Sequence, residues 1–107
     1  KQHQFFEMTD DVPYMNQVVK VKEEYKDKLP AVTHVDGSAR VQTVYRYTII
    51  HDLLMEFEKL SGYPILLNTS FNIKDKTMVL TPKDAVDTFF DTDMDILVMG
   101  NYVMYKN

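Results

Sequence analysis

Hydrophobic and polar positions alternate over residues 16–21, the first clear pattern along the chain. Val19 and Val21 fall on one side of an extended chain and Lys20 falls on the other, which predicts a half-buried strand. The charged stretch that follows, residues 22–28, predicts a solvated loop.

Two more short strands are predicted at residues 32–35 and 40–44. Asp36 and Gly37 lie between them, and Asp-Gly is a strong turn signal because glycine adopts a positive φ without steric cost. The pattern therefore predicts three strands before the first long helix.

From Thr48 the apolar positions change to the spacing of an amphipathic helix. The residues at this spacing are Ile50, Leu53, Leu54, Phe57 and Leu60. Gly62 and Pro64 are expected to end the helix. The apolar run that follows, residues 63–68, predicts a buried strand with Pro64 at its edge or first position.

A second helix has the clearest local start signal in the chain. Thr81 is predicted as the N-cap, Pro82 as the first helical residue and Asp84 as the partner in a capping arrangement. Its core face comprises Ala85, Val86, Phe89 and Phe90. Residues 95–99 and 102–105 then predict two strands joined by a Gly-Asn turn.

The expected order of elements is β-β-β-α-β-α-β-β. This order favours an α/β fold of α+β-like character, with a mixed twisted sheet and two main helices. The chain has 107 residues, of which 45% are hydrophobic, which suits one small domain and leaves no room for a second.

Composition excludes several classes of function. Acidic residues outnumber basic ones by 16 to 12 and the basic residues are scattered, so no nucleic-acid partner is expected. There is no cysteine, which excludes thiol catalysis and Cys-ligated zinc, and the three histidines show no metal-binding spacing. No apolar run is long enough to cross a membrane, so no membrane partner is expected and a cytoplasmic location is the default.

Small polar residues gather where the predicted strand at residues 63–68 ends. They are Asn68, Thr69, Ser70 and Asn72. Their hydroxyl and amide groups can donate to phosphate oxygens without the cost of burying a charge, and ligands of α/β sheets collect at strand ends. The alternative is an ordinary turn that only reverses the chain.

Three further candidates surround the Asp-Gly turn: His34, Asp36 and Arg40. A guanidinium group can bind a phosphate through two parallel hydrogen bonds. The alternatives are an exposed surface cation for Arg40 and a structural histidine for His34.

Four strings of the sequence resemble the C-terminal domain of NodU/CmcH-type O-carbamoyltransferases. They are LPAVTHVDGSARVQTV at residues 29–44, PILLNTSFN at 64–72, TPKDA at 81–85 and DILVMG at 95–100. Their order and spacing also match, and the resemblance extends from about residue 14 to residue 105. It identifies residues 1–107 as the C-terminal part of such a domain.

The resemblance implies a YrdC-like partial domain that binds ATP, expected with Mg²⁺, and carbamoyl phosphate to form carbamoyl adenylate and pyrophosphate. An N-terminal domain of the same protein, which would hold the catalytic metal, would then pass the carbamoyl group to an acceptor hydroxyl. Ser70 and Asn72 match the family's Ser-x-Asn element at the nucleotide site. Arg40 is carried over as the catalytic contact to phosphate or carbamoyl, beside His34 and Asp36.

Two departures from the family's pattern affect the site. Family members carry an upstream stretch of the kind RALGNRS, and this chain begins after it, so part of the site is expected to lie outside the chain. The loop after Asn72 has Ile73-Lys74-Asp75-Lys76 where a glycine is common, and aspartate is among the residues that best tolerate a positive φ there.

An enzyme subdomain and a catalytically silent assembly module both remain compatible with the residues. An oligomer is compatible with either role. Binding of carbamoyl phosphate and ATP separates the two.

Overall fold

The computed structural model describes all residues, from Lys1 to Asn107, and divides into two compact units. The first unit comprises Lys1–Leu67 and the second Asn68–Asn107.

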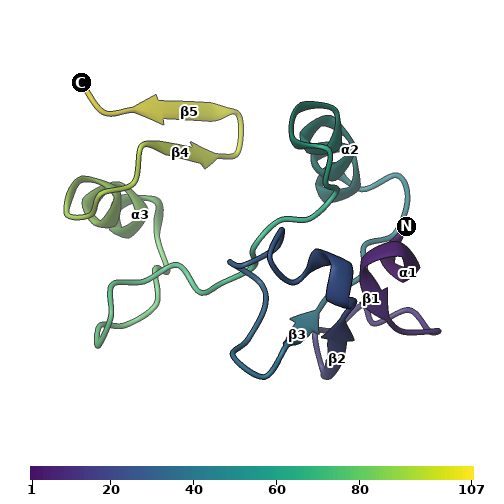
Figure 1. The fold of residues 1–107 in the computed structure, drawn as a ribbon. Coiled ribbons are helices and arrows are strands. Elements are labelled where there is room, and N and C mark those ends of the chain that lie inside the picture. Colours follow the sequence, from purple (N-terminus) through teal and green to yellow (C-terminus); the bar gives the residue numbers. More distant parts are fainter. The chain divides into compact units, whose positions relative to one another are not determined.

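The first unit is built on a three-stranded antiparallel sheet in the order β1-β2-β3 (Figure 1). Its elements are α1 (Gln2–Phe5), β1 (Phe6–Glu7), β2 (Gln17–Val21), the 3₁₀ helix η1 (Glu23–Tyr25), β3 (Ser38–Val41) and α2 (Ile49–Ser61). In the register of β2 and β3, Lys20 lies opposite Ser38 and Val18 opposite Arg40.

Side-chain alternation along these strands creates the core of the first unit. Val21 of β2 and the pair Ala39 and Val41 of β3 are buried, whereas Lys20 and Arg40 are exposed. The buried strand residues pack with Phe5, Phe6, Val12 and Leu29. The alternation predicted for residues 16–21 is confirmed.

Helix α2 begins and ends where the sequence predicts. The Thr48 hydroxyl accepts a hydrogen bond from the His51 backbone N–H, and Gly62 ends the helix at a φ of 83°. No residue of α2 is buried, and Ile49 and Leu60 are exposed by 83% and 88%. Its apolar face is therefore largely open to solvent.

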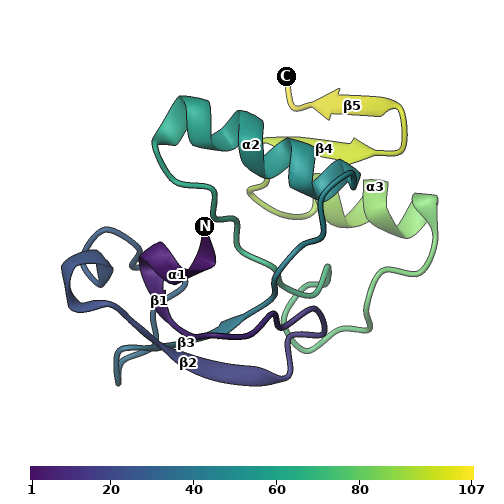
Figure 2. The ribbon, with the colours of Figure 1, turned by 90° about the vertical axis from the view of Figure 1, so that its right-hand side faces the viewer.

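The second unit contains helix α3 (Pro82–Phe90) and the hairpin of β4 (Ile96–Met99) and β5 (Tyr102–Tyr105), seen from the side in Figure 2. Ala85 and Phe89 of α3 pack with Leu97 of β4 to form its small core. The predicted capping box is confirmed, because Thr81 and Asp84 each accept a hydrogen bond from the other's backbone N–H. The predicted closing hairpin is also confirmed.

The predicted combination of α and β structure with two main helices is confirmed. The strands form two small antiparallel sheets, one in each unit, in place of a single mixed sheet. The elements α1 and β1 were not predicted, because segments of four and two residues are too short to show a period. None of the helices has the length and hydropathy that spanning a membrane requires.

Three predicted strands need correction. Residues 32–35 form no strand: Val32 and Val35 lie in turns and the two residues between them are irregular, since Pro30 and the tight turn at Gly37 leave no extended length. The strand predicted at residues 40–44 lies instead at Ser38–Val41. Residues 63–68 form no strand: they lack a ladder partner, Pro64 has no N–H to donate, and Leu67 is 62% exposed.

Candidate functional site

A tight turn at His34–Gly37 leads into β3. The Gly37 N–H donates to the His34 carbonyl at 2.9 Å, and the His34 N–H donates to the Ser38 carbonyl at 2.7 Å. Gly37 has a φ of 81°, which explains the glycine at this position. The Asp-Gly turn signal in the sequence is thus confirmed.

Side chains at this turn form a short chain of hydrogen bonds through Ser38. The Asp36 Oδ1 accepts from the Ser38 N–H at 3.0 Å and from the Ser38 hydroxyl at 2.6 Å. The Ser38 oxygen also lies 3.1 Å from His34 Nδ1. Donation by the Ser38 hydroxyl, followed by that of the Ser38 N–H, lowers the pKa of Asp36, so this carboxylate stays ionised near neutral pH.

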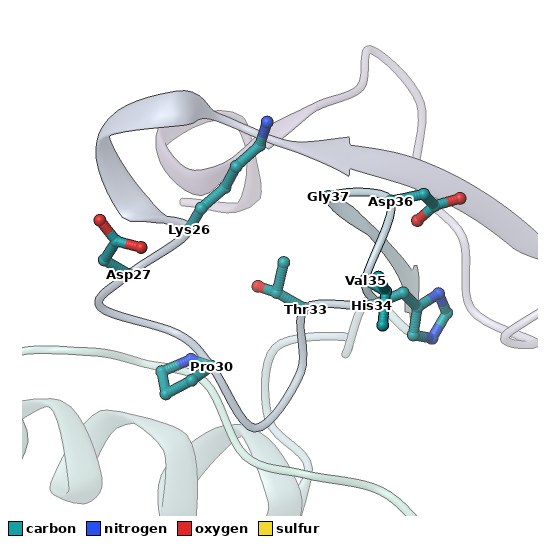
Figure 3. A pocket seen from close by; sticks show the side chains of 8 residues that line it. All are labelled: Lys26, Asp27, Pro30, Thr33, His34, Val35, Asp36 and Gly37. Atoms are coloured by element: carbon teal, nitrogen blue, oxygen red, sulfur yellow. The ribbon is translucent and has the colours of Figure 1, made fainter.

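Beside the turn lies an open surface hollow of about 390 Å³ (Figure 3). It is lined by Lys26, Asp27, Pro30, Thr33, His34, Val35, Asp36 and Gly37. The Lys26 ammonium lies 2.5 Å from the Glu23 carboxylate, and that hydrogen bond raises the pKa of Lys26. With one cation already paired and two carboxylates, the hollow has no excess of positive charge.

Arg40 lies two residues beyond Ser38 on β3. The neighbouring Ala39 and Val41 are buried, so Arg40 and Ser38 lie on the opposite face of the strand. Arg40 is exposed, and its guanidinium makes no hydrogen bond or ion pair within the chain. His34 and Asp36 thus lie in the turn that precedes β3, and Arg40 lies on the strand itself, two residues after Ser38.

The remaining predicted site residues belong to the second unit. Asn68, Thr69 and Ser70 are exposed, and they do not follow a strand, because the predicted strand does not form. Asn72 is half-buried, and its Nδ2 donates to the Ile73 carbonyl at 3.1 Å. Asn72 thus has a local structural role, which agrees in part with the alternative of an ordinary turn.

The loop after Asn72 forms without glycine. Asp75 adopts a φ of 65°, and the Lys76 N–H donates to the Ile73 carbonyl at 3.0 Å. The expectation that aspartate would accommodate a positive φ here is confirmed. A second hollow, of about 250 Å³, lies between this loop and α3.

Neither hollow is lined by Arg40, Ser70 or Asn72. The convergence of Arg40 with Ser70 and Asn72 on one ligand stays a prediction. The chain also gathers no group of three or more His, Asp or Glu side chains that could hold a metal ion.

Ser38 was not singled out from the sequence as a site residue. The signal was present, because an aspartate two positions before a serine in an Asp-Gly turn is the pattern of an Asx-turn, in which the carboxylate accepts from the backbone two residues on. What the pattern did not reveal is that the buried Ser38 hydroxyl also connects Asp36 to His34.

The chain thus combines α/β units with a polar turn and an exposed arginine two residues after Ser38. The model of the family described as "Carbamoyltransferase C-terminus" matches residues 1–106. The chain belongs to this carbamoyltransferase C-terminal family.

Curated relatives agree with this assignment. The chain is 47% identical over 109 residues to nodulation protein NolNO of Sinorhizobium fredii, which covers 97% of the chain and 16% of that protein. It is 45% identical over 108 residues to nodulation protein NolO of Bradyrhizobium diazoefficiens, covering 96% of the chain and 20% of that protein. The chain therefore spans a fifth or less of the length of these relatives.

Proposed function

We propose that this chain supplies part of a site at which carbamoyl phosphate and ATP form carbamoyl adenylate, in a carbamoyltransferase that passes the carbamoyl group to an acceptor hydroxyl. The match to the carbamoyltransferase C-terminal family over residues 1–106 carries this proposal. The unpaired Arg40 beside the polar turn supports it, since both substrates are anionic.

In the proposed reaction an oxygen of the carbamoyl group bonds to the α-phosphorus of ATP, and the bond from that phosphorus to the bridging oxygen breaks. Pyrophosphate leaves. The attacking oxygen is freed when one water molecule cleaves the bond between that oxygen and the phosphorus of carbamoyl phosphate, and the phosphate leaves as inorganic phosphate. Transfer to the acceptor then releases AMP.

The proposed reaction depends mainly on positioning and charge neutralisation, because the reacting groups are both anionic and repel each other. Arg40 would neutralise a phosphate or polarise the carbamoyl group. Ser70, with an exposed hydroxyl, and its neighbours Asn68, Thr69 and Asn72 would contribute neutral donors.

The test is carbamoyl-phosphate-dependent release of pyrophosphate from ATP by the longest natural gene product that carries this sequence. We expect Arg40→Ala to lower kcat/KM by about ten- to a hundredfold, the effect of losing one hydrogen bond to a charged group. Arg46→Ala is the matched control, because Arg46 is the other arginine and is also exposed. Equal activity of the two variants would remove Arg40 from the site, and absence of pyrophosphate release would contradict the proposed reaction.

The open apolar face of α2 favours a second candidate function, a silent module that assembles with another part of a larger protein. Ile49 and Leu60 are almost fully exposed, and solvent-facing apolar residues along one helix are typical of contact surfaces. A protein that binds neither carbamoyl phosphate nor ATP at this chain, yet requires α2 for assembly, would support this candidate over the enzyme.

A further inference from the structure

The chain of hydrogen bonds at the Asp-Gly turn fixes which nitrogen of His34 carries the proton. Ser38 has a single hydroxyl proton, and it points to Asp36 across 2.6 Å. The oxygen of Ser38 can then only accept from His34 Nδ1, 3.1 Å away. A neutral His34 must therefore be protonated at Nδ1 and unprotonated at Nε2.

The unprotonated Nε2 of His34 is available to a ligand. No group of the chain forms a hydrogen bond with His34 Nε2, and the side chain is exposed at the edge of the hollow. Figure 3 shows the His34 ring with one nitrogen toward Asp36 and the other turned away from it. A neutral imidazole nitrogen without a proton accepts hydrogen bonds and donates none.

As a hydrogen-bond acceptor, His34 Nε2 can bond only to donor groups of the proposed substrates. Phosphate oxygens and the carbamoyl carbonyl oxygen are themselves acceptors, so a neutral Nε2 cannot hydrogen-bond to them. The amino group of carbamoyl phosphate is a donor and is the group that distinguishes it from acetyl phosphate or inorganic phosphate. A hydrogen bond to this donor discriminates between the ligands, because the analogue without the donor leaves the acceptor unpaired.

We propose that His34 Nε2 accepts a hydrogen bond from the amino group of carbamoyl phosphate, and that Ser38, whose hydroxyl proton is held by Asp36, is the positioning residue that keeps His34 in this tautomer. This inference rests on the proposed function and goes further by assigning the residue that reads the carbamoyl group. Ser38 itself is buried, so it acts through His34 and does not touch the substrate.

The first test is the tautomer of His34, read from the two ring-nitrogen shifts in histidine-labelled protein at about pH 8.5, where histidine side chains are in general neutral. We expect a proton on Nδ1 in the wild type and in Ser38→Thr, which keeps the hydroxyl. Ser38→Ala should give a mixture of tautomers. His3 is the internal control, because its Nδ1 lies 2.7 Å from the Met8 carbonyl, which can only accept, and its tautomer should not respond to Ser38. A wild-type His34 protonated at Nε2 would overturn the inference.

The second test compares the dissociation constants of carbamoyl phosphate and acetyl phosphate in the longest protein that carries this chain. We expect His34→Phe to reduce the preference for carbamoyl phosphate by about two- to tenfold, the effect of one neutral hydrogen bond, and Ser38→Ala to reduce it less. His3→Phe should leave the preference unchanged, because His3 is also exposed but lies outside the turn.

The outcomes separate this inference from the proposed function. If carbamoyl phosphate binds and the preference survives His34→Phe, the assignment of His34 is wrong and the proposed function stands. If pyrophosphate is released and His34→Phe weakens the binding of ATP but leaves the preference for carbamoyl phosphate over acetyl phosphate unchanged, His34 contacts the nucleotide and the carbamoyl contact is overturned. If carbamoyl phosphate does not bind at all, both proposals are contradicted, whatever the tautomer of His34.

Discussion

Single residues around Gly37 set the shape of the proposed site. Gly37 has a φ of 81°, and a methyl group added there would lie 2.8 Å from Lys26 Cε. Lys26 thus crosses directly over the turn that carries His34 and Asp36, and it holds Glu23 with its ammonium group. The turn depends on glycine for its backbone angles, and the position of Lys26 depends on the absence of a side chain.

We expect Gly37→Ala to lower the free energy of unfolding by about 1–2 kcal/mol, the cost of a left-handed backbone for a residue with a Cβ. The contact with Lys26 should add little, because the end of that flexible side chain can move away. Gly62→Ala is the matched control, since Gly62 has a similar φ of 83° and nothing within 4 Å of the added carbon. Chemical denaturation measures both.

Similar costs for the two variants would confirm that backbone conformation dominates at Gly37. A much larger cost at Gly37, recovered in a Gly37→Ala, Lys26→Ala double variant, would mean that the Lys26 contact is rigid. That result would contradict the expectation that the end of the Lys26 side chain moves away.

At the scale of elements, the helices with complete end signals formed as predicted. Helix α3 has Thr81 as N-cap, Pro82 at the first position and a reciprocal bond from Asp84. These signals act through neighbouring backbone groups, so their effect does not depend on distant parts of the chain. Strands differ, because a strand needs a partner at another place in the sequence.

We expect Thr81→Ala to destabilise α3 by about 1 kcal/mol near neutral pH, because it leaves an N-terminal N–H group of the helix without its acceptor. Thr77→Ala, in the exposed loop before α3, is the control and should have little effect. Thermal unfolding followed by circular dichroism measures both. Equal effects of the two substitutions would contradict the role of the cap.

The cost of Thr81→Ala should shrink in acid. The pKa of Asp84 is lowered, first by hydrogen bonding with the Thr81 side chain and then by the backbone N–H of Leu80. Because this pKa lies below the ordinary value of 3.8, the stabilisation is complete above that value and is lost as the pH falls through the lowered pKa. A cost that stays constant down to full protonation would argue against the bond to Asp84.

At the scale of the whole molecule, net charge opposes the proposed ligands. The chain has a formal charge of −4, and ATP and carbamoyl phosphate are both anions. Arg40 is an exposed cation two residues after Ser38, and the hollow beside the turn is lined by the carboxylates of Asp27 and Asp36. Long-range electrostatics therefore repels these ligands unless other cations contribute.

We expect ATP to bind to this 107-residue chain on the order of a hundredfold or more weakly than to a longer protein that also carries the arginine-containing stretch typical of the family. Two charge-assisted hydrogen bonds, each of about 1.5–3 kcal/mol, account for that factor. Calorimetric titration of ATP into both proteins is the measurement. Equal micromolar binding would mean that the site is not divided between this chain and that stretch.

The sequence by itself determined the features that arise from near neighbours. The caps of α2 and α3, the glycine turn at Gly37, the hairpin of β4 and β5 and the positive φ of Asp75 all follow from residues within a few positions of each other. Family membership was also readable, because the strings that carry it are continuous. Of the proposed site, the sequence supplied Arg40, Ser70 and the residues of the Asp-Gly turn as candidates.

Only the tertiary structure decided which extended segments became strands and which side chains met. Residues 63–68 have the apolar composition of a buried strand, yet Tyr63 and Ile65 pack against the core of the first unit while no strand pairs with their backbone. The hydrophobic pattern of a sequence indicates which side chains prefer burial. Backbone pairing depends in addition on a partner strand that the rest of the chain brings near. For the same reason, the role of the buried Ser38 hydroxyl between Asp36 and His34 could be found only from the folded turn.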